Sequence, residues 1–433
     1  MRLLVLGAAV SGRAVARLAR RQGHAVTVYD EGRPDPAGLL DIGAGIVSGA
    51  WDPGLLDGVD LVVASPGFSE RSLPVVETLE WGVPIWSEIE YAWRHLEGVP
   101  VIAVTGTNGK TTVTTLTAQM LQASGLNAPA VGNIGTPLAD AVGIQADALV
   151  VETSSFQLRF IDRFHAPAAA ILNIAADHLD WHGSVQAYAA AKRRIFERQT
   201  DDDLLVFDAD DPGAAEAVRH ATSRLHPVSA HTRPAGGSGI DARYVHIGED
   251  LRIPISDLGS ADPAHIVDVA AAGALALDRG GEPEAVAAVA TSFAPGPHRR
   301  VLVARVNGVD YVDDSKATNP HAALAAIAAY PSVILIAGGL SKGLDLMPLV
   351  DAPHVRDVVG LGTSGPNLVA EAGERGHLAS SMEDAVETAA RLARPGDTVL
   401  LAPGAASFDQ FESYAHRGEV FAAAVTQLRE EQR

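Results

Sequence analysis

The amino-acid sequence predicts an α/β protein of three domains: a Rossmann-like N-terminal domain, a central domain of the P-loop ATPase type and a Rossmann-like C-terminal domain. Short apolar runs alternate with helix-like stretches along the chain, as in repeated β-α-β units with mainly parallel sheets. The chain has 433 residues, and a domain usually takes about 150. Its residues are 47 % hydrophobic and only 5 % aromatic, which suits layers of small aliphatic side chains.

The first domain is expected to open with a strand, a helix and further strands. These elements are Leu3–Leu6, Ser11–Gln22, Ala25–Tyr29 and Leu61–Ala64. The loop Leu96–Pro100 then precedes a new apolar run, so we place the first boundary between residues 97 and 98.

The central and C-terminal domains continue the alternation. The strands expected in the central domain are Val101–Thr105, Leu149–Glu152, Ala169–Asn173 and Leu204–Phe207, and Ala230–Asp241 is expected to be a loop. A Pro/Gly-rich stretch, Ala294–Pro297, sets the second boundary between residues 294 and 295. The strands expected after it are Asp310–Val312, Val333–Ala337, Val358–Leu361 and Thr398–Leu401. The predicted domains are therefore 1–97, 98–294 and 295–433.

Composition excludes several classes of protein. The net charge of −20 argues against a nucleic-acid partner, which would select a basic face. No window approaches the roughly 18 apolar residues of a membrane span. The chain has no Cys, so disulfides and thiol chemistry are excluded. We expect a cytoplasmic protein without a membrane segment.

The strongest motif predicts an ATP-binding loop. Thr105 is followed by Gly106, Thr107, Asn108, Gly109, Lys110, Thr111 and Thr112, between an apolar strand and a helical stretch. Such a turn directs backbone N–H groups at phosphate oxygens, with Lys110 at the β- and γ-phosphates and the Thr111 hydroxyl on Mg²⁺. Val104 stands where the general pattern has its first Gly, so this is a variant loop. The competing interpretation is an ordinary glycine turn with a surface lysine.

A second glycine turn, Gly7–Gly12, follows the first strand, and Asp30 ends the second. The pair is similar to a dinucleotide fingerprint. Ala9 occupies the position of the middle glycine, which weakens the NAD interpretation and leaves a UDP group in a shifted pose. A plain structural turn explains this motif about equally well.

Polar residues follow other predicted strands. Glu152 ends one strand and His178 follows another, where open α/β sheets place their sites, and both are suitable Mg²⁺ or Mn²⁺ ligands. Asp313–Pro320 packs two acids, a lysine and two hydroxyls into one turn. A helix cap beside a solvated lysine accounts for that composition equally well. Lys342, Ser407 and Phe408 also follow predicted strands.

Together these motifs resemble the Mur ligases and the related folylpolyglutamate synthetases. The resemblance rests on Thr105–Thr112, Asp314–Asn319, Gly338–Gly343 and Leu401–Phe411, and it extends over essentially the whole chain. Within the Mur ligases, the C-terminal motifs are most similar to those of the members that add D-glutamate. The resemblance implies an ATP-dependent ligase of peptidoglycan synthesis that joins D-glutamate to UDP-N-acetylmuramoyl-L-alanine through an acyl phosphate.

The resemblance also implies residue roles. It assigns Lys110, Lys192, His178 and Glu152 to catalysis; Gly106, Thr107, Asn108, Gly109, Lys110, Thr111, Thr112, Arg299 and Asp314 to ATP; Val10, Ser11, Asp30, Ser65, Gly67, Asn133, Ser154 and Gln157 to the UDP substrate; and Thr318, Lys342, Ser407, Phe408 and Tyr414 to D-glutamate. Two Mg²⁺ sites would use Thr111, Glu152, His178 and Lys192, with Lys192 carbamylated. The competing interpretation of Lys192 is a lysine on a helix surface.

Departures from the family pattern accompany this match. Ala9 replaces a glycine, Ile266 stands where an Asn near the adenine is usual, Val301 stands where an acid is common, and Ala405 stands where a Cys is frequent. Two other classes stay open on sequence alone: an NAD-linked oxidoreductase, and a P-loop switch that hydrolyses ATP without forming an amide. We expect a monomer.

Overall fold

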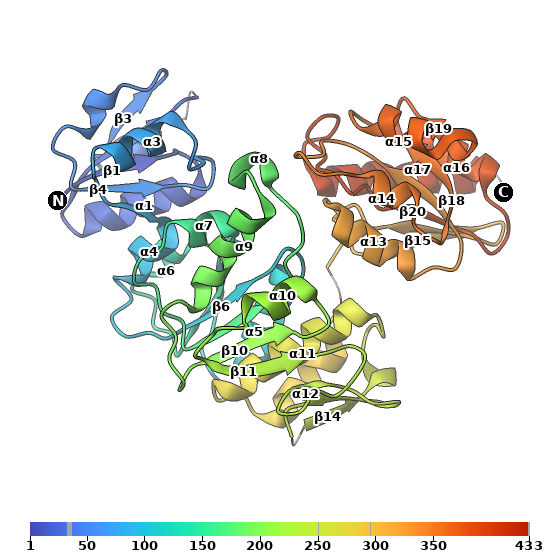
Figure 1. Cartoon of the computed structure of the whole chain (residues 1–433), viewed down its shortest axis with the longest axis horizontal. Helices are drawn as coiled ribbons and strands as arrows, with labels where there is room; N and C mark the ends of the chain where they lie inside the picture. Colours follow the sequence, from blue (N-terminus) through green and yellow to red (C-terminus); the bar gives the residue numbers. More distant parts are fainter. Residues whose placement is uncertain (33–36, 250, 295, 432–433) are drawn as a thin grey trace. The chain divides into compact units, whose positions relative to one another are not determined.

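The computed structural model describes residues 1–32, 37–249, 251–294 and 296–431. It divides into two compact units, one made of residues 1–174 and 181–293 and the other of 175–180 and 294–433. The first unit contains two large sheets, and the second unit contains one (Figure 1). Residue 295, beside the second predicted boundary, lies outside the described residues, and the three-domain boundaries remain predictions.

The first sheet of the first unit is parallel, with the order β3-β2-β1-β4-β5. Its strands are β1 (Arg2–Leu6), β2 (Ala25–Asp30), β3 (Gly45–Ser48), β4 (Leu61–Ala64) and β5 (Ile85–Ser87); its helices are α1 (Val10–Arg21), α2 (Ala37–Leu40), α3 (Leu73–Glu80) and α4 (Glu88–Trp93). The order reverses at β1 and β4, so the turns that follow these two strands lie side by side at one sheet edge.

The second sheet is parallel too, with the order β11-β10-β9-β6-β8-β7. Its strands are β6 (Val101–Thr105), β7 (Ala130–Gly132), β8 (Leu149–Glu152), β9 (Ala168–Ile171), β10 (Leu204–Asp208) and β11 (Arg224–Val228). The helices along this part of the chain are α5 (Lys110–Ala123), α6 (Leu138–Ala141), α7 (Ser155–Arg159), α8 (Leu179–His182), α9 (Val185–Arg193), α10 (Pro212–Ala217), α11 (Pro263–Asp278) and α12 (Pro283–Ser292). Because β6 is flanked by β8 and β9, the segments after these three strands share one edge.

A small antiparallel sheet was not expected from the sequence. It consists of β12 (Gly239–Ile240), β13 (Tyr244–Ile247) and β14 (Leu251–Pro254). The expectation of a loop over Ala230–Asp241 is therefore wrong at its end, where β12 pairs with β13. These strands are too short to show a clear alternation in the sequence.

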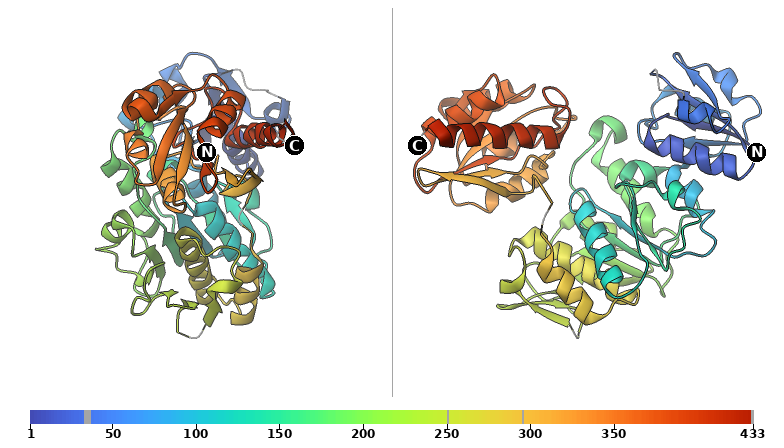
Figure 2. Two further views of the ribbon diagram at one scale, coloured as in Figure 1. Left: turned by 90° about the vertical axis from the view of Figure 1, so that its right-hand side faces the viewer. Right: turned by 180° about the vertical axis from the view of Figure 1, so that it is seen from behind.

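The sheet of the second unit has the order β15-β16-β20-β17-β18-β19 and is parallel except for the β15–β16 pair. Its elements are β15 (Val301–Val306), β16 (Val309–Asp313), α13 (Pro320–Ala328), β17 (Val333–Ala337), α14 (Met347–Val350), β18 (Val355–Gly360), α15 (Gly365–Ala372), β19 (Gly376–Leu378), α16 (Met382–Leu392), β20 (Thr398–Leu401) and α17 (Tyr414–Glu431). The long α17 lies across one face of this sheet (Figure 2).

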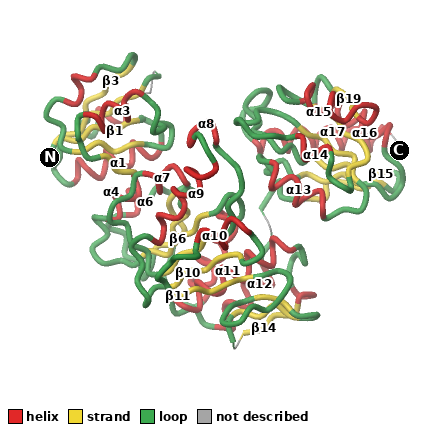
Figure 3. The backbone as a smooth tube through the Cα atoms, in the orientation of Figure 1, coloured by secondary structure: helices red, strands yellow, loops and turns green. Residues whose placement is uncertain are grey.

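Helices flank the large sheets (Figure 3), and six inner strands are buried at every position: β4, β6, β8, β9, β17 and β20. β6, β8 and β17 read as continuous apolar runs because neither face meets water. The predicted α/β class is confirmed. No helix among the described residues is long and apolar enough to cross a membrane.

Candidate active site

The turn between β6 and α5 carries the predicted phosphate-binding residues. Gly109, directly before α5, has a φ of +82°, which glycine adopts without strain. A side chain at Gly106 would meet the carbonyl oxygen of Asn108 at 2.9 Å. The glycines thus allow a tight turn whose backbone can approach an anion at the start of α5.

Lys110 folds back over this turn. Its Nζ donates to the carbonyl oxygens of Gly106 (2.8 Å) and Thr107 (2.9 Å). Thr111 and Thr112 follow in the first helical turn; Thr112 is buried and Thr111 half-buried. The Lys110 ammonium therefore lies where it can meet phosphate oxygens bound by the turn.

Asn173 fixes the same turn and was missed in the sequence. Its side-chain oxygen accepts from the backbone N–H of Asn108 (2.7 Å), and its carbonyl oxygen accepts from that of Thr107 (2.9 Å). The strand expected over Ala169–Asn173 stops at Ile171 because Asn173 turns toward the loop. An asparagine directly after a buried strand was the available signal.

Lys192 of α9 is buried against this turn, with only 1 % of its surface exposed. Its Nζ donates to the Gly106 carbonyl oxygen at 2.7 Å and lies 3.4 Å from Thr105 Oγ1. It also lies 4.7 Å from the Tyr188 ring centroid, and the Tyr188 hydroxyl donates to Thr107 Oγ1 at 3.1 Å. The interpretation of Lys192 as a helix-surface lysine is therefore wrong.

Glu152, at the end of β8, presents a buried carboxylate at the same sheet edge. Its Oε1 accepts from Asn133 Nδ2 at 2.8 Å, and its carbonyl oxygen accepts from the Asn133 backbone N–H at 2.9 Å. Its Oε2 is buried without a hydrogen-bond partner among the described residues. A buried carboxylate oxygen in this state is costly unless a cation or donor meets it, so it fits a metal ligand.

Two further predicted substrate residues form a capping box at the start of α7. Ser154 Oγ accepts from the Gln157 backbone N–H, and Gln157 Oε1 accepts from both the backbone N–H and the hydroxyl of Ser154. Both residues are buried, whereas Asn133 nearby in the site is exposed. Asn133 is thus the most accessible of these three.

Five of the predicted UDP-substrate residues lie at or after the ends of β1, β2 and β4: Val10, Ser11, Asp30, Ser65 and Gly67. Ser65 donates its backbone N–H to the Leu6 carbonyl oxygen at 2.9 Å, which ties the turn after β4 to β1. Asp30 accepts from the backbone N–H of Ala8 at 2.7 Å, so its carboxylate already caps the turn of the dinucleotide-like motif. Val10 is 64 % exposed beside the half-buried Ser11, and Gly67 is exposed.

His178 is placed differently from the other predicted metal ligands, because the segment 175–180 packs with the second unit. There its neighbour Asp177 is buried and accepts from Lys342 Nζ at 3.2 Å and from Asn319 Nδ2 at 3.3 Å. Burial alone would raise the pKa of Asp177, but the charges of His178 and Lys342 and their hydrogen bonds lower it.

The second unit gathers the predicted D-glutamate residues from separate segments. Leu340 and Ala406 exchange two backbone hydrogen bonds of 2.9 Å, which places the turn of Lys342 beside the segment of Ser407. The Gly404 N–H donates to the Ala317 carbonyl oxygen, next to Thr318, at 2.9 Å. The remaining members of the set are exposed to solvent to some degree: Thr318, Phe408 and Tyr414.

Arg417 holds these segments together and was missed in the sequence. Its guanidinium is buried and donates to Ser315 Oγ (2.9 Å), the Ser315 carbonyl oxygen (2.8 Å) and the Ala405 carbonyl oxygen (3.0 Å). Burial lowers its pKa to about 10. It lies inside a helix rich in charged residues, so nothing in the sequence distinguished it from a surface arginine.

Asp314 and Arg299 are the predicted ATP contacts of the second unit, and the charge of Arg299 acts on the Asp314 carboxylate. Burial raises the pKa of Asp314 to about 6, and the charges of Arg300 and Arg299 oppose that rise. Asp313 accepts from His298 Nδ1 at 2.6 Å. The turn after β16 is thus polar, buried and charged, which a solvated helix cap is not.

No preformed metal cage accompanies these residues: across the described ranges, no group of three or more His, Asp or Glu side chains could hold a metal ion. The Thr111 hydroxyl and the unpartnered Glu152 oxygen still fit Mg²⁺, which usually takes few protein ligands and shares substrate phosphates.

Family models and curated proteins match this chain. Residues 104–243 match the Mur ligase middle domain, and residues 298–405 match the Mur ligase, glutamate ligase domain. A UDP-N-acetylmuramoylalanine--D-glutamate ligase of Frankia casuarinae is 43 % identical over 98 % of this chain and 93 % of the relative. The enzyme of the same name in Thermobifida fusca is 41 % identical over 99 % of this chain and 98 % of the relative.

Solved structures share the fold. A pseudomurein peptide ligase type C from Methanothermus fervidus superposes with a TM-score of 0.61 at 17 % identity, covering 99 % of each chain. UDP-N-acetylmuramate-alanine ligase from Thermotoga maritima gives 0.59 at 17 % identity, covering 99 % of this chain and 100 % of the other. Because two Mur ligase family models match residues 104–243 and 298–405, and the Frankia relative is 43 % identical over 98 % of the chain, the chain belongs to the Mur ligase family.

Proposed function

We propose that this protein is an ATP-dependent ligase that joins D-glutamate to UDP-N-acetylmuramoyl-L-alanine in peptidoglycan precursor synthesis. The observation that carries the proposal is the identity of 43 % over 98 % of the chain with a relative of that name. ATP and UDP-sugars are made inside the cell, so the enzyme would act in the cytoplasm, and we expect it to act as a monomer.

The proposed reaction has two steps. A carboxylate oxygen of the L-alanyl group attacks the γ-phosphorus of ATP, the bond to the bridging oxygen breaks, and ADP leaves. The amine of D-glutamate then attacks the acyl carbon of the acyl phosphate, inorganic phosphate leaves, and the amine loses a proton. Both steps bring anions together, so cationic groups must offset their repulsion.

The phosphate turn supplies that offset on the protein side. Lys110 would move from the carbonyl oxygens of Gly106 and Thr107 to the phosphate oxygens of ATP, and Arg299 and Asp314 would contact the nucleotide. Thr111, Glu152 and His178 would hold Mg²⁺, a cofactor that Mur ligases generally use with ATP. When bound, Mg²⁺ neutralises charge on the phosphate oxygens.

Lys192 would complete a second metal site as a carbamate. A carbamate forms when a neutral amine attacks the carbon of CO₂ and releases one proton to solvent, and it replaces an ammonium by a carboxylate-like group. Burial of Nζ supports this proposal because it disfavours the charged amine.

Hydrogen-bond donors of the second unit would recognise the two carboxylates of D-glutamate. The Lys342 ammonium, the Thr318 and Ser407 hydroxyls and nearby backbone N–H groups suit two carboxylates on a short amino acid. Phe408 and Tyr414 would flank it. Val10, Ser11, Asp30, Ser65, Gly67, Asn133, Ser154 and Gln157 would bind the UDP substrate.

A coupled assay separates this function from the alternatives. ADP release is measured with each UDP-muramoyl substrate and each amino acid, alone and in pairs. Sustained ADP release by the ligase requires both co-substrates and is fastest with D-glutamate, whereas a P-loop switch would keep releasing ADP without them. Membership of the Mur ligase family removes the support for an NAD-linked oxidoreductase.

A further inference from the structure

Two glutamates of α4 are almost completely buried, and neither was expected to have a role. Glu88 is 1 % exposed and Glu90 is 0 % exposed. They lie two positions apart in the short helix that follows the last strand of the first sheet. Both carboxylates accept hydrogen bonds from segments that connect strands of the second sheet, and each carboxylate binds different segments.

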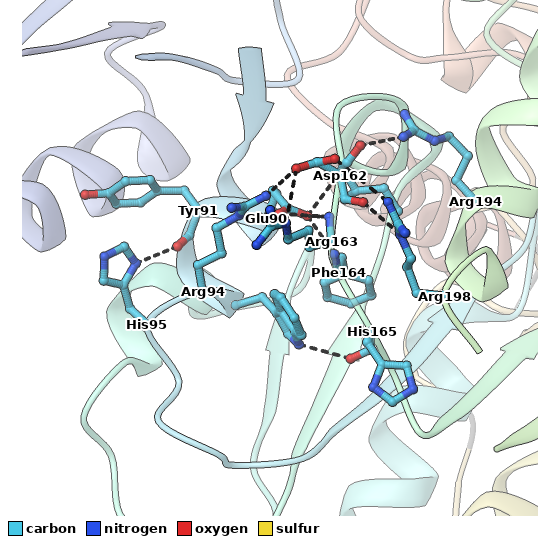
Figure 4. Close-up of polar contacts among 12 residues, drawn as sticks. Glu90, Tyr91, Arg94, His95, Asp162, Arg163, Phe164, His165, Arg194 and Arg198 are labelled. Carbon is cyan, nitrogen blue, oxygen red and sulfur yellow. Dashed lines mark hydrogen bonds and ion pairs between the residues drawn. The ribbon is translucent and has the colours of Figure 1, made fainter. Parts of the chain in front are cut away.

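Glu90 binds a segment that carries none of the predicted site residues. Its two oxygens accept from the backbone N–H groups of Asp162, Arg163 and Phe164 at 2.8–3.1 Å, and Arg94 donates to it at 2.6 Å (Figure 4). This carboxylate is fully satisfied and joins α4 to the chain between α7 and β9.

Glu88 binds the segments that carry predicted substrate residues. Its Oε1 accepts from the Ala139 backbone N–H at 2.7 Å, at the start of α6. The short loop before α6 begins with Asn133, whose side chain holds the Glu152 carboxylate. Its Oε2 accepts from Gln157 Nε2 at 3.4 Å, and Gln157 closes the capping box around Ser154.

The Glu88 carboxylate therefore binds two segments that carry predicted UDP-substrate residues, and we call these segments the two walls of that site. One wall is the exposed loop that begins with Asn133, and the other is the turn of Ser154 and Gln157. We propose that Glu88 is a positioning residue for the nucleotide-sugar substrate: its ionised carboxylate fixes these two walls in their binding geometry. The inference rests on the proposed function, since it takes the substrate from there.

The state of Glu88 depends on pH near neutrality. Burial raises its pKa to about 7, opposed by the Ala139 and Gln157 hydrogen bonds, and the charge of Asp140 raises it further. Asp140 of α6 is itself paired with Arg17 of α1 at 2.6 Å. Further charged groups on the elements around it include Glu90, which is bound as described, and Arg159 at the end of α7, which is paired with Glu70 at 2.6 Å. The remaining arginines of α1 are Arg13, Arg20 and Arg21.

Protonation changes what Glu88 can do. A carboxylate accepts strong hydrogen bonds at both oxygens. A neutral carboxyl group accepts weaker hydrogen bonds, and its O–H group needs an acceptor of its own. As pH falls below about 7, the support of the Asn133 loop should weaken. The phosphodiester and carboxylate groups of the UDP substrate do not titrate in this range, so its affinity reports on the protein.

The test is calorimetric binding of UDP-N-acetylmuramoyl-L-alanine alone to the full chain, across neutral pH, without ATP. Wild type should bind more weakly as pH falls. Glu88→Gln should bind about tenfold more weakly at high pH, the loss of roughly one well-placed hydrogen bond, and should show no pH dependence. Glu88→Asp, which keeps a carboxylate, should retain the pH dependence.

Glu90→Gln is the matched control, since it removes an equally buried charge from the same helix. It should lower the unfolding temperature while leaving affinity and its pH dependence unchanged. Equal effects of the two glutamine variants, or a pH-independent wild type, would overturn the role of Glu88. A wild type that binds no UDP-muramoyl compound at any pH would overturn the proposed function as well.

Discussion

Lys192 Nζ lies 2.7 Å from the carbonyl oxygen of Gly106, in the turn that is predicted to bind ATP. This contact places a buried amine from α9 directly against the phosphate turn. Lys192→Ala should therefore lower kcat by about two orders of magnitude or more, as removal of an electrostatic group from an active site does.

The carbamate itself has a direct signature. Wild type in ¹³C-bicarbonate should show a carbamate carbon resonance that Lys192→Arg lacks, and short carboxylic acids should restore part of the activity of Lys192→Ala. Absence of both the resonance and the rescue would leave Lys192 as a structural amine that supports the turn.

Lys110→Ala tests the phosphate turn. The variant should lose two to four orders of magnitude in kcat, about what the loss of a major electrostatic stabiliser produces. Its unfolding temperature should be nearly that of wild type, because Nζ donates to two carbonyl oxygens of its own turn and the side chain is not part of the apolar core. Steady-state kinetics with thermal unfolding decides this, and a variant that keeps most of its activity contradicts the ATP assignment.

Lys342→Ala tests the amino-acid site. The KM for D-glutamate should rise far more than the KM for ATP, because the ammonium that would meet a carboxylate is lost. Wild type should strongly prefer D-glutamate over L-alanine, which leaves donors unpaired, and over lysine or diaminopimelate, which bring a second ammonium. Comparable kcat/KM for lysine would refute the assignment of the amino acid.

Arg417→Met should destabilise the second unit. The substitution keeps much of the apolar stem but leaves the carbonyl oxygens of Ser315 and Ala405 without their donor. Each buried acceptor left in this state costs about 1–3 kcal/mol. Chemical denaturation measures the loss, and the KM for D-glutamate should rise with it because the segments that Arg417 joins carry that site.

Glu88 also gives a stability prediction. Its pKa is raised in the folded protein, so the ionised form is disfavoured there, and the fold loses stability as pH rises from the unfolded pKa toward about 7. The free energy of unfolding of wild type should therefore fall relative to that of Glu88→Gln as pH rises from about 5 to about 8. The difference between the two proteins should change by up to about 3 kcal/mol. Parallel denaturation curves at both pH values measure the difference, and a constant difference contradicts the raised pKa.

Local patterns carried most of the fold and part of the site. The core strands β1, β6 and β8 are short apolar runs bounded by glycine or polar residues, so their positions can be read from neighbouring residues alone. The turn from Gly106 to Lys110 is equally local, since its glycines and lysine are consecutive in the chain.

The remaining contacts depend on residues far apart in the chain. Arg417 binds Ser315 across 102 positions, Lys342 meets Asp177 across 165, and Gln157 reaches Glu88 across 69. No pattern in a single sequence distinguishes these side chains from solvated ones. Burial and partner, which only the folded chain supplies, decide their roles.

The segment Ala175–Asp180 makes the second unit discontinuous in sequence, because residues 181–293 separate it from the rest of that unit. During translation this segment leaves the ribosome long before Lys342 and Asn319, which later pair with Asp177. A fragment of residues 294–433 would lack this segment, and a chain that ends at residue 293 would carry Asp177 without Lys342 and Asn319. Each unit therefore combines separate stretches of the sequence, and neither can be completed before both of its stretches have been synthesised.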